Sequence, residues 1–341
     1  MFEVKDLKQE KKYLNEFQAT CTDKQWKDII NYLHIILKSY LQSHNPNIAE
    51  HEDIIALLKK LNTQTDDEYI RMETLRSMTL HYWNMRLYEL AFETSVQLCK
   101  SIENMPDTIY PNKETCYYDI AEKYYHFKEY DSAIVWYNKT FDVNSYKQNI
   151  LNIYNGLGLC YCSLNNLGMS NFYFNKMLSF SSDSGVLISD IWYGIAKGNL
   201  GYNLYLEEKY DEAIPLLEFS LKTMIRHEDF AFASGTAIDL ANIYLKKKSM
   251  QKAYSYGNMA YDYEKKMTRV GRMERIYFFW TKYYTINNNS EKALLYLDSA
   301  AKEQQKNSDM FNATKLLRIE QRTFLQKQEA KDKEIALTKK R

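Results

Sequence analysis

Five asparagines stand in the middle of segments whose apolar spacing predicts helices. They are Asn152, Asn155, Asn199, Asn203 and Asn242. Asparagine is a poor helix former, because its side chain competes for backbone hydrogen bonds. Each amide offers a donor and an acceptor together, so it can hydrogen-bond in both directions with the backbone of an extended peptide. The alternative interpretation is neutral drift in an asparagine-rich chain, which also has three asparagines in a row at 287–289.

The residue types that catalysis requires do not occur in any recognisable sequence motif. The six histidines include no metal-ligand spacing such as H-E-x-x-H, and no glycine loop of the phosphate-binding types is present. The similar stretches beginning at His51 and His227 fall at predicted helix starts or loops, where their acidic residues favour the helix dipole. We therefore expect no enzyme activity, no cofactor and no metal site.

Small residues and cysteines suggest packing instead of chemistry. Gly156 and Gly158 lie within one predicted helix, and the glycines at 194, 198 and 201 share one face of another, which is typical of close helix contacts. The five cysteines are an odd number. Cys160 and Cys162 are two apart in a helical pattern, so their side chains point in roughly opposite directions. We expect reduced thiols that behave as small apolar groups.

The composition favours long helices. The 341 residues include only 10 Gly and 4 Pro, fewer than the frequent turns of all-β folds require. A hydrophobic content of 45 % with 26 % charged residues is typical of a globular chain. Since 45 basic residues nearly balance 44 acidic ones, non-specific nucleic-acid binding is not expected. No run of 18 apolar residues exists, so no transmembrane helix is predicted, and the charged start predicts no secretory signal peptide.

One pattern recurs six times with a spacing of about 40 residues. A first helix carries an aromatic residue, a small residue and, in most copies, a tyrosine; after a short polar turn, a second helix opens on another small residue. The small residues of the first helices are Thr79, Ala121, Gly158, Gly201, Ala241 and Thr281. Those of the second helices are Ala91, Ala133, Ser170, Ala213, Ala253 and Ala293. Antiparallel helices about 8–10 Å apart need such small side chains where they cross.

These residues resemble the tetratricopeptide repeat, whose pattern is W-x2-L-G-x2-Y followed by A-x3-F. The resemblance covers residues 70–303, although the family's standard unit is 34 residues. It is strongest to the longer-repeat arrays of bacterial sensor and regulator proteins. It implies an all-α fold: a right-handed superhelix (an α-solenoid) of about six helix pairs at 67–310. A helical cap or degenerate repeats are expected at 1–66, and a charged helix at 311–341.

The resemblance also implies a function. It is a non-catalytic module that binds a peptide or protein on the concave wall formed by the first helices, within a bacterial signalling or transcriptional regulatory protein. The family positions that face this wall carry over to Arg76, Tyr118, Glu122, Asn152, Asn155, Asn199, Tyr202, Asp239, Asn242, Arg275 and Lys282. The alternative function is a self-associating scaffold or adaptor without a groove ligand. The sequence does not specify the oligomeric state.

The two ends of the chain do not match the repeat. Near the N-terminus, Thr22 and Asp23 can cap a helix. One face of this helix carries Trp26, Ile29, Ile30, Leu33, Ile36 and Leu37, and a second short amphipathic helix includes Leu57. The segment 315–341 has nine cations and four anions. It is interpreted either as a capping helix or as a charged stalk that leads to a membrane span further downstream. The first case places the protein in the cytoplasm, and the second places the array in the periplasm or outside the cell.

Overall fold

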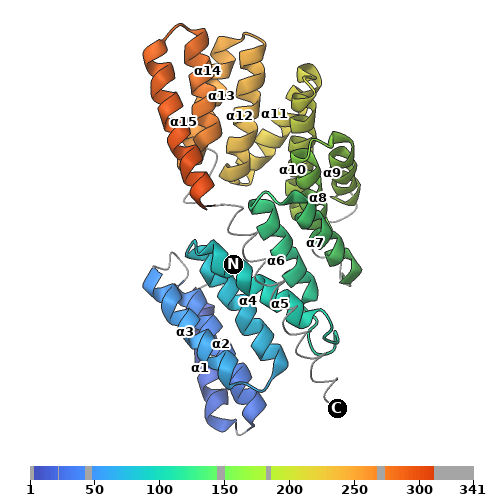
Figure 1. Ribbon diagram of the computed structural model, residues 1–341, viewed down its shortest axis with the longest axis vertical. Coiled ribbons are helices and arrows are strands. Elements are labelled where there is room, and N and C mark those ends of the chain that lie inside the picture. The colour runs from blue at the N-terminus through green and yellow to red at the C-terminus, as the bar shows by residue number, and fades with distance from the viewer. Residues whose placement is uncertain are drawn as a thin grey trace, which may run out of the picture. The chain divides into compact units, whose positions relative to one another are not determined.

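The computed structural model describes residues 4–21, 23–42, 48–143, 150–181, 186–266 and 273–310 (Figure 1). Within these ranges every regular element is an α-helix. None of the described helices is both long enough and apolar enough to cross a membrane. The charged helix predicted at 311–341 lies outside the described residues. The all-α fold expected from the sequence is confirmed.

Three helices precede the repeats: α1 (Val4–Thr20), α2 (Lys24–Gln42) and α3 (Ile48–Gln64). The remaining helices fall at the predicted pairs of first and second helices. They are α4 (Glu68–Asn84), α5 (Tyr88–Ile102), α6 (Lys113–His126), α7 (Tyr130–Val143), α8 (Ile150–Ser163), α9 (Leu167–Ser181), α10 (Val186–Leu206), α11 (Tyr210–Arg226), α12 (Phe230–Lys246), α13 (Met250–Lys265), α14 (Met273–Ile286) and α15 (Ser290–Met310). We call the first helix of each pair helix A.

The chain divides into two compact units. Of the described residues, those within Met1–Lys128 and Asn138–Asn144 form unit 1, and those within Glu129–Tyr137 and Ser145–Phe311 form unit 2. Unit 1 therefore contains α1 to α6, and unit 2 contains α8 to α15, while α7 contributes to both. The first boundary, after Lys128, falls in the turn between α6 and α7.

The turns inside the pairs explain how long helices reverse with so little glycine. After α12, Lys248 adopts a left-handed backbone with φ of 58°, and Ser249 N donates to the Tyr244 carbonyl over 2.8 Å. The corresponding bond ends at Tyr161 after α8 and at Tyr284 after α14. This geometry satisfies carbonyls at the helix end, and glycine usually occupies the left-handed position. Here Lys, Asn, Arg and Glu occupy it instead.

The predicted small residues lie where helices touch. Ala133, Ser170, Ala213 and Ala253 are fully buried. A Cβ atom on Gly158 would stand 2.4 Å from the Phe174 ring, so only glycine fits this crossing of α8 and α9. The glycines at 194, 198 and 201 likewise face α11 at contact distance. The packing interpretation of these residues is therefore confirmed.

The chain has 30 tyrosines, and in unit 2 the one that recurs in the repeat has a structural role. Tyr244 of α12 stacks on Tyr256 of α13 with an interplanar angle of 1°, and Tyr284 of α14 stacks on Tyr296 of α15 at 6°. Tyr161 and Tyr173 form the same pair between α8 and α9. Stacked rings bury a large apolar area, and the hydroxyl groups of Tyr244 and Tyr256 both donate to Glu218 over 3.2 Å. The repeated tyrosine therefore joins helix A to its partner.

The face predicted for α2 is only partly correct. Asp23 Oδ1 accepts a hydrogen bond from Trp26 N, which confirms the predicted cap. Ile30 is buried, but Trp26 and Leu33, expected on the same apolar face, are 51 % and 44 % exposed. Leu37 of the predicted face is buried as expected, and Ile35, which was not predicted on that face, is buried too. The helix therefore leaves apolar side chains at the surface of unit 1.

Replacing Gly158 by alanine is expected to lower the free energy of unfolding by about 1–3 kcal/mol, because the added methyl group overpacks the Phe174 ring. Gly168 is the matched control, since a Cβ atom there would meet only Asn166 Oδ1 at 3.8 Å. Gly168→Ala should cost nothing measurable in urea unfolding. Equal effects of the two substitutions would contradict the proposed close contact.

Candidate functional site

Five of the predicted site residues come together in unit 2. Asn155 lies on α8, Asn199 and Tyr202 on α10, Asp239 on α12 and Arg275 on α14. All four helices are A helices of consecutive pairs. We call these five residues the inner cluster.

The first part of the inner cluster is an amide pair. Asn199 Nδ2 donates a hydrogen bond to Asn155 Oδ1 over 2.9 Å. Within the described residues, Asn199 Oδ1 and Asn155 Nδ2 form no further hydrogen bond. Asn199 is 9 % exposed and Asn155 is half-buried. The pair therefore presents one acceptor and donor N–H groups at fixed positions on adjacent A helices.

The second part is an ion pair with an aromatic support. The guanidinium group of Arg275 pairs with the buried carboxylate of Asp239, and it lies 5.6 Å from the centroid of the Tyr202 ring. The charge of Asp239 raises the pKa of Arg275 above its ordinary value. The Arg275 side chain still keeps 42 % of its surface exposed. A guanidinium group has five N–H donors in a fixed plane, so donors remain for a ligand.

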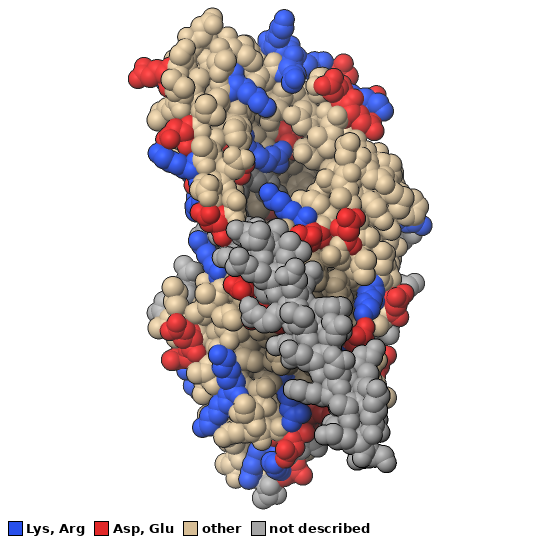
Figure 2. Space-filling view, viewed as in Figure 1, with Lys and Arg blue, Asp and Glu red and all other residues tan. Residues whose placement is uncertain are grey.

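The contact between Tyr202 and Arg275 joins A helices that are not neighbours. Their helices, α10 and α14, are separated in the array by α12. The two side chains therefore meet across α12, on the surface that the A helices share. Figure 2 shows a hollow in the surface of unit 2, with Lys and Arg side chains at its edge.

Four further residues of unit 2 that the sequence pattern singled out are arranged differently. Asn242 donates from Nδ2 to the Ile238 carbonyl of its own helix over 2.8 Å, so part of its amide is already engaged. Asn152 is half-buried on α8, and Lys282 is exposed on α14. Asn203 is fully buried and donates to Ser170 and Asn171. It therefore joins α10 to α9 and does not face a ligand.

The predicted residues of unit 1 lie on α4 and α6. Tyr118 and Glu122 are half-buried on α6, and burial, followed by the charge of Glu122, raises the pKa of Tyr118. The guanidinium group of Arg76 is engaged on α4 by Glu73, with Nη2 to Oε2 at 2.6 Å. Arg76 thus serves as the partner of a buried carboxylate in this structure.

Glu73 was not among the predicted residues, although it is the centre of a polar network in unit 1. Its carboxylate also accepts hydrogen bonds from Tyr32 and Tyr110, at 3.1 and 2.8 Å. Burial favours the neutral form of Glu73, but Arg76 and the Tyr110 hydroxyl outweigh it, so the pKa of Glu73 lies below its ordinary value. The only signal in the sequence is the spacing of three between Glu73 and Arg76, which places them on one helix face.

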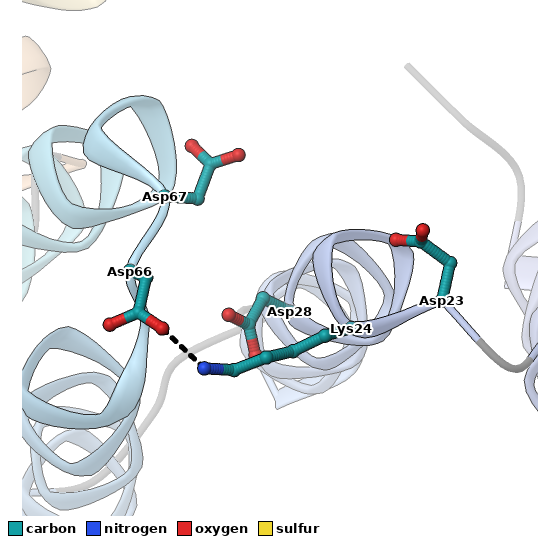
Figure 3. A pocket seen from close by; sticks show the side chains of 5 residues that line it. All are labelled: Asp23, Lys24, Asp28, Asp66 and Asp67. Atoms are coloured by element: carbon teal, nitrogen blue, oxygen red, sulfur yellow. Dashed lines mark hydrogen bonds and ion pairs between the residues drawn. The ribbon is translucent and has the colours of Figure 1, made fainter.

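A pocket of about 370 Å³ in unit 1 is lined by Asp23, Lys24, Asp28, Asp66 and Asp67 (Figure 3). Each side chain has a structural partner. Asp23 and Asp67 cap α2 and α4, Asp28 accepts from Thr65, and Asp66 pairs with Lys24. Nowhere in the described part of the chain do three or more His, Cys, Asp or Glu side chains gather in a metal-binding arrangement. The acidic character of this pocket is therefore explained by helix capping and local pairing.

No protein-family model and no curated protein sequence matches the chain. Solved structures do resemble its fold. The apo form of the quorum sensor NprR from B. thuringiensis has a TM-score of 0.65 at 16 % identity, with 92 % of both chains covered. The apo form of RapI has a TM-score of 0.64 at 14 % identity, with 82 % of this chain and 99 % of RapI covered.

A tetratricopeptide repeat protein from Parabacteroides merdae is similar too, with a TM-score of 0.60 at 15 % identity and coverage of 83 % of this chain and 98 % of that protein. These TM-scores show a shared fold, and identities this low show nothing beyond the fold. The long-repeat tetratricopeptide architecture expected from the sequence is thus confirmed.

Proposed function

We propose that the chain, which has the fold of a tetratricopeptide repeat array, binds an extended peptide on the inner cluster of unit 2. The observation that carries the proposal is the arrangement of Asn155, Asn199 and Arg275. On one surface, three A helices present donor and acceptor groups that can still form hydrogen bonds with a ligand. The function is non-catalytic recognition.

The chemistry of the cluster suits a peptide backbone. An extended backbone alternates N–H donors and C=O acceptors, and the amide pair offers an acceptor and donors in return. Arg275 is neutralised by Asp239, so its remaining N–H groups serve a carbonyl oxygen without requiring an acidic ligand. The Tyr202 ring adds an apolar surface beside these groups.

Two similar structures support the proposal, because they are peptide complexes of the same fold. One is NprR in complex with its cognate peptide NprX, with a TM-score of 0.63 at 18 % identity. The other is a Rap protein complexed with competence and sporulation factor, with a TM-score of 0.59 at 12 % identity. By analogy with these two proteins, we propose that this chain is a sensing module of a regulatory protein. Residues 67–310 would form its binding array.

The experiment is selection of linear heptapeptides from a random display library on the full chain, followed by calorimetric titration of the enriched peptides. We expect Asn155→Ala and Asn199→Ala each to weaken binding about tenfold, because each leaves a desolvated backbone group of the ligand unpaired.

The matched control is Asn175→Ala, since Asn175 is an exposed asparagine in the middle of α9, outside the A helices. Circular dichroism melting would establish that all variants are folded. Enriched peptides that bind all three variants with wild-type affinity would refute the proposal.

A further inference from the structure

A second pocket, of about 360 Å³, lies between α2 and α3 in unit 1. The two helices are antiparallel neighbours (Figure 1): near the start of α2, Asp28 accepts from Thr65 just after α3, and near its end Lys38 faces Asp53 at the start of α3. This pairing places Ile35 opposite Leu57, and Asn31 opposite Leu61. The pocket is separate from the inner cluster of unit 2.

The floor of the pocket is apolar. Ile35 and Leu61 line it from opposite helices and are 8 % and 6 % exposed. Leu57 also lines it and keeps 38 % of its surface exposed. An apolar group placed on these three side chains would remove the exposed part of Leu57 from water, which is favourable in proportion to the buried area.

The rim of the pocket is cationic. Lys38, Lys60 and His34 line it, and no lining residue is acidic. In the described part of the chain Lys60 has no carboxylate partner, and Lys38 has only the exposed Asp53 at 4.0 Å. Burial, followed by the nearby charge of Lys11, lowers the pKa of His34 and so favours its neutral form, which leaves Lys38 and Lys60 as the cations of the rim. The positive charge at this site is therefore largely uncompensated.

We propose that this pocket binds a small organic anion with an apolar body, of the class of medium-chain carboxylates. The carboxylate would lie at Lys60, and the chain would extend along Leu61, Ile35 and Leu57 toward Lys38. The volume stands at the lower end of the range of about 300–1,000 Å³ for small-ligand pockets, so the ligand is small. Asn31 and Gln64 supply amide groups at the same end of the pocket as Lys60.

The test is calorimetric titration of the full chain with octanoate, octan-1-ol and acetate. Octan-1-ol has the same apolar length without the charge, and acetate has the charge without the chain. We expect saturable binding of octanoate with a dissociation constant below about 1 mM, and binding at least fivefold weaker for both other probes.

The matched variants are Lys60→Met and Lys59→Met, which change adjacent exposed lysines of α3. Lys59 does not line the pocket; its Nζ lies 5.8 Å from the centroid of the Tyr82 ring. Lys60→Met should weaken octanoate binding about fivefold and leave octan-1-ol unaffected, while Lys59→Met should change neither. Equal binding of octanoate and octan-1-ol, equal effects of the two variants, or no saturable octanoate binding would each overturn the proposal.

Discussion

Replacing Arg76 by methionine is expected to lower the free energy of unfolding by about 3–5 kcal/mol, the range typical of breaking a buried ion pair by removing one partner. The reason is the environment of Glu73, which is 3 % exposed and whose charge is compensated chiefly by Arg76. Methionine keeps much of the volume of the arginine stem but leaves the carboxylate buried and without a cation. Urea unfolding at pH 7 measures the loss.

Arg226→Met is the matched control for this substitution. Arg226 also pairs with a carboxylate, Asp190, but its side chain is 61 % exposed, so its loss should cost no more than about 1 kcal/mol. The double variant of Glu73→Gln with Arg76→Met should recover part of the loss, because it removes the uncompensated charge. If Arg76→Met costs no more than Arg226→Met, Glu73 is not a buried charge that depends on Arg76.

Acidification from pH 6.5 to 4 is expected to destabilise unit 1 through a pair of histidines. His51 of α3 and His81 of α4 are 7 % and 5 % exposed, and their Nδ1 atoms are 2.7 Å apart. Such a hydrogen bond requires a neutral acceptor nitrogen. The Ser39 hydroxyl lies 3.3 Å from His81 Nε2, on the other side of the ring.

The direction of this pH effect follows from the histidine pKa values. Burial, followed by the charge of His51, lowers the pKa of His81 from 6.5 to about 4. Burial also lowers the pKa of His51, against the opposing charge of Glu50. The unfolded chain therefore binds more protons than the folded chain between pH 6.5 and 4. The contribution of the histidine pair to the free energy of unfolding is fully present above pH 6.5. It falls by up to about 3 kcal/mol as the pH drops to 4.

Urea unfolding at several pH values, with His81→Gln for comparison, measures this contribution. Carboxylates titrate in the lower part of the same range, so the difference between the two pH profiles is the informative quantity. The wild-type chain should lose about 3 kcal/mol more than the variant between pH 6.5 and 4. Parallel profiles would mean that the histidine pair does not depend on protonation.

The helix pairs could be predicted from the sequence because their determinants are local and repeat. Ala133, Ser170 and Ala253 recur at one position because helices cross there, and each is fully buried. Tyr161, Tyr244 and Tyr284 recur because each stacks on a tyrosine of the next helix. A pattern repeated six times averages out the ambiguity of any single copy.

The polar networks could not be predicted, because they join residues that are distant in the sequence and have no common spacing. His51 and His81 are 30 residues apart, and Tyr32 is 41 residues from Glu73. Each polar group looks ordinary on its own helix and acquires its role only through tertiary packing. The exposure of Trp26 and Leu33 could not be predicted either, since an apolar stripe does not specify which of its residues a neighbouring helix covers.

The residues of the candidate site could be predicted from the sequence in part. Positions carried over from the repeat brought Asn155, Asn199, Tyr202, Asp239 and Arg275 onto one surface, as the structure shows. The same positions did not distinguish Asn242, whose amide donates to its own helix, from Asn199, whose amide donates to Asn155 of the preceding A helix. That difference depends on the side-chain geometry of each asparagine and not on the repeat position.

Site-specific photo-crosslinking tests the peptide-binding account most directly. Tyr202 and Tyr193 both lie on α10, but the Tyr193 ring contacts Phe219 of α11, away from the inner cluster. Each would be replaced in turn by p-benzoylphenylalanine and irradiated with a selected heptapeptide. The account predicts a peptide adduct from position 202 and none from position 193. An adduct from position 193 alone, or from neither position while the peptide still binds, would contradict it.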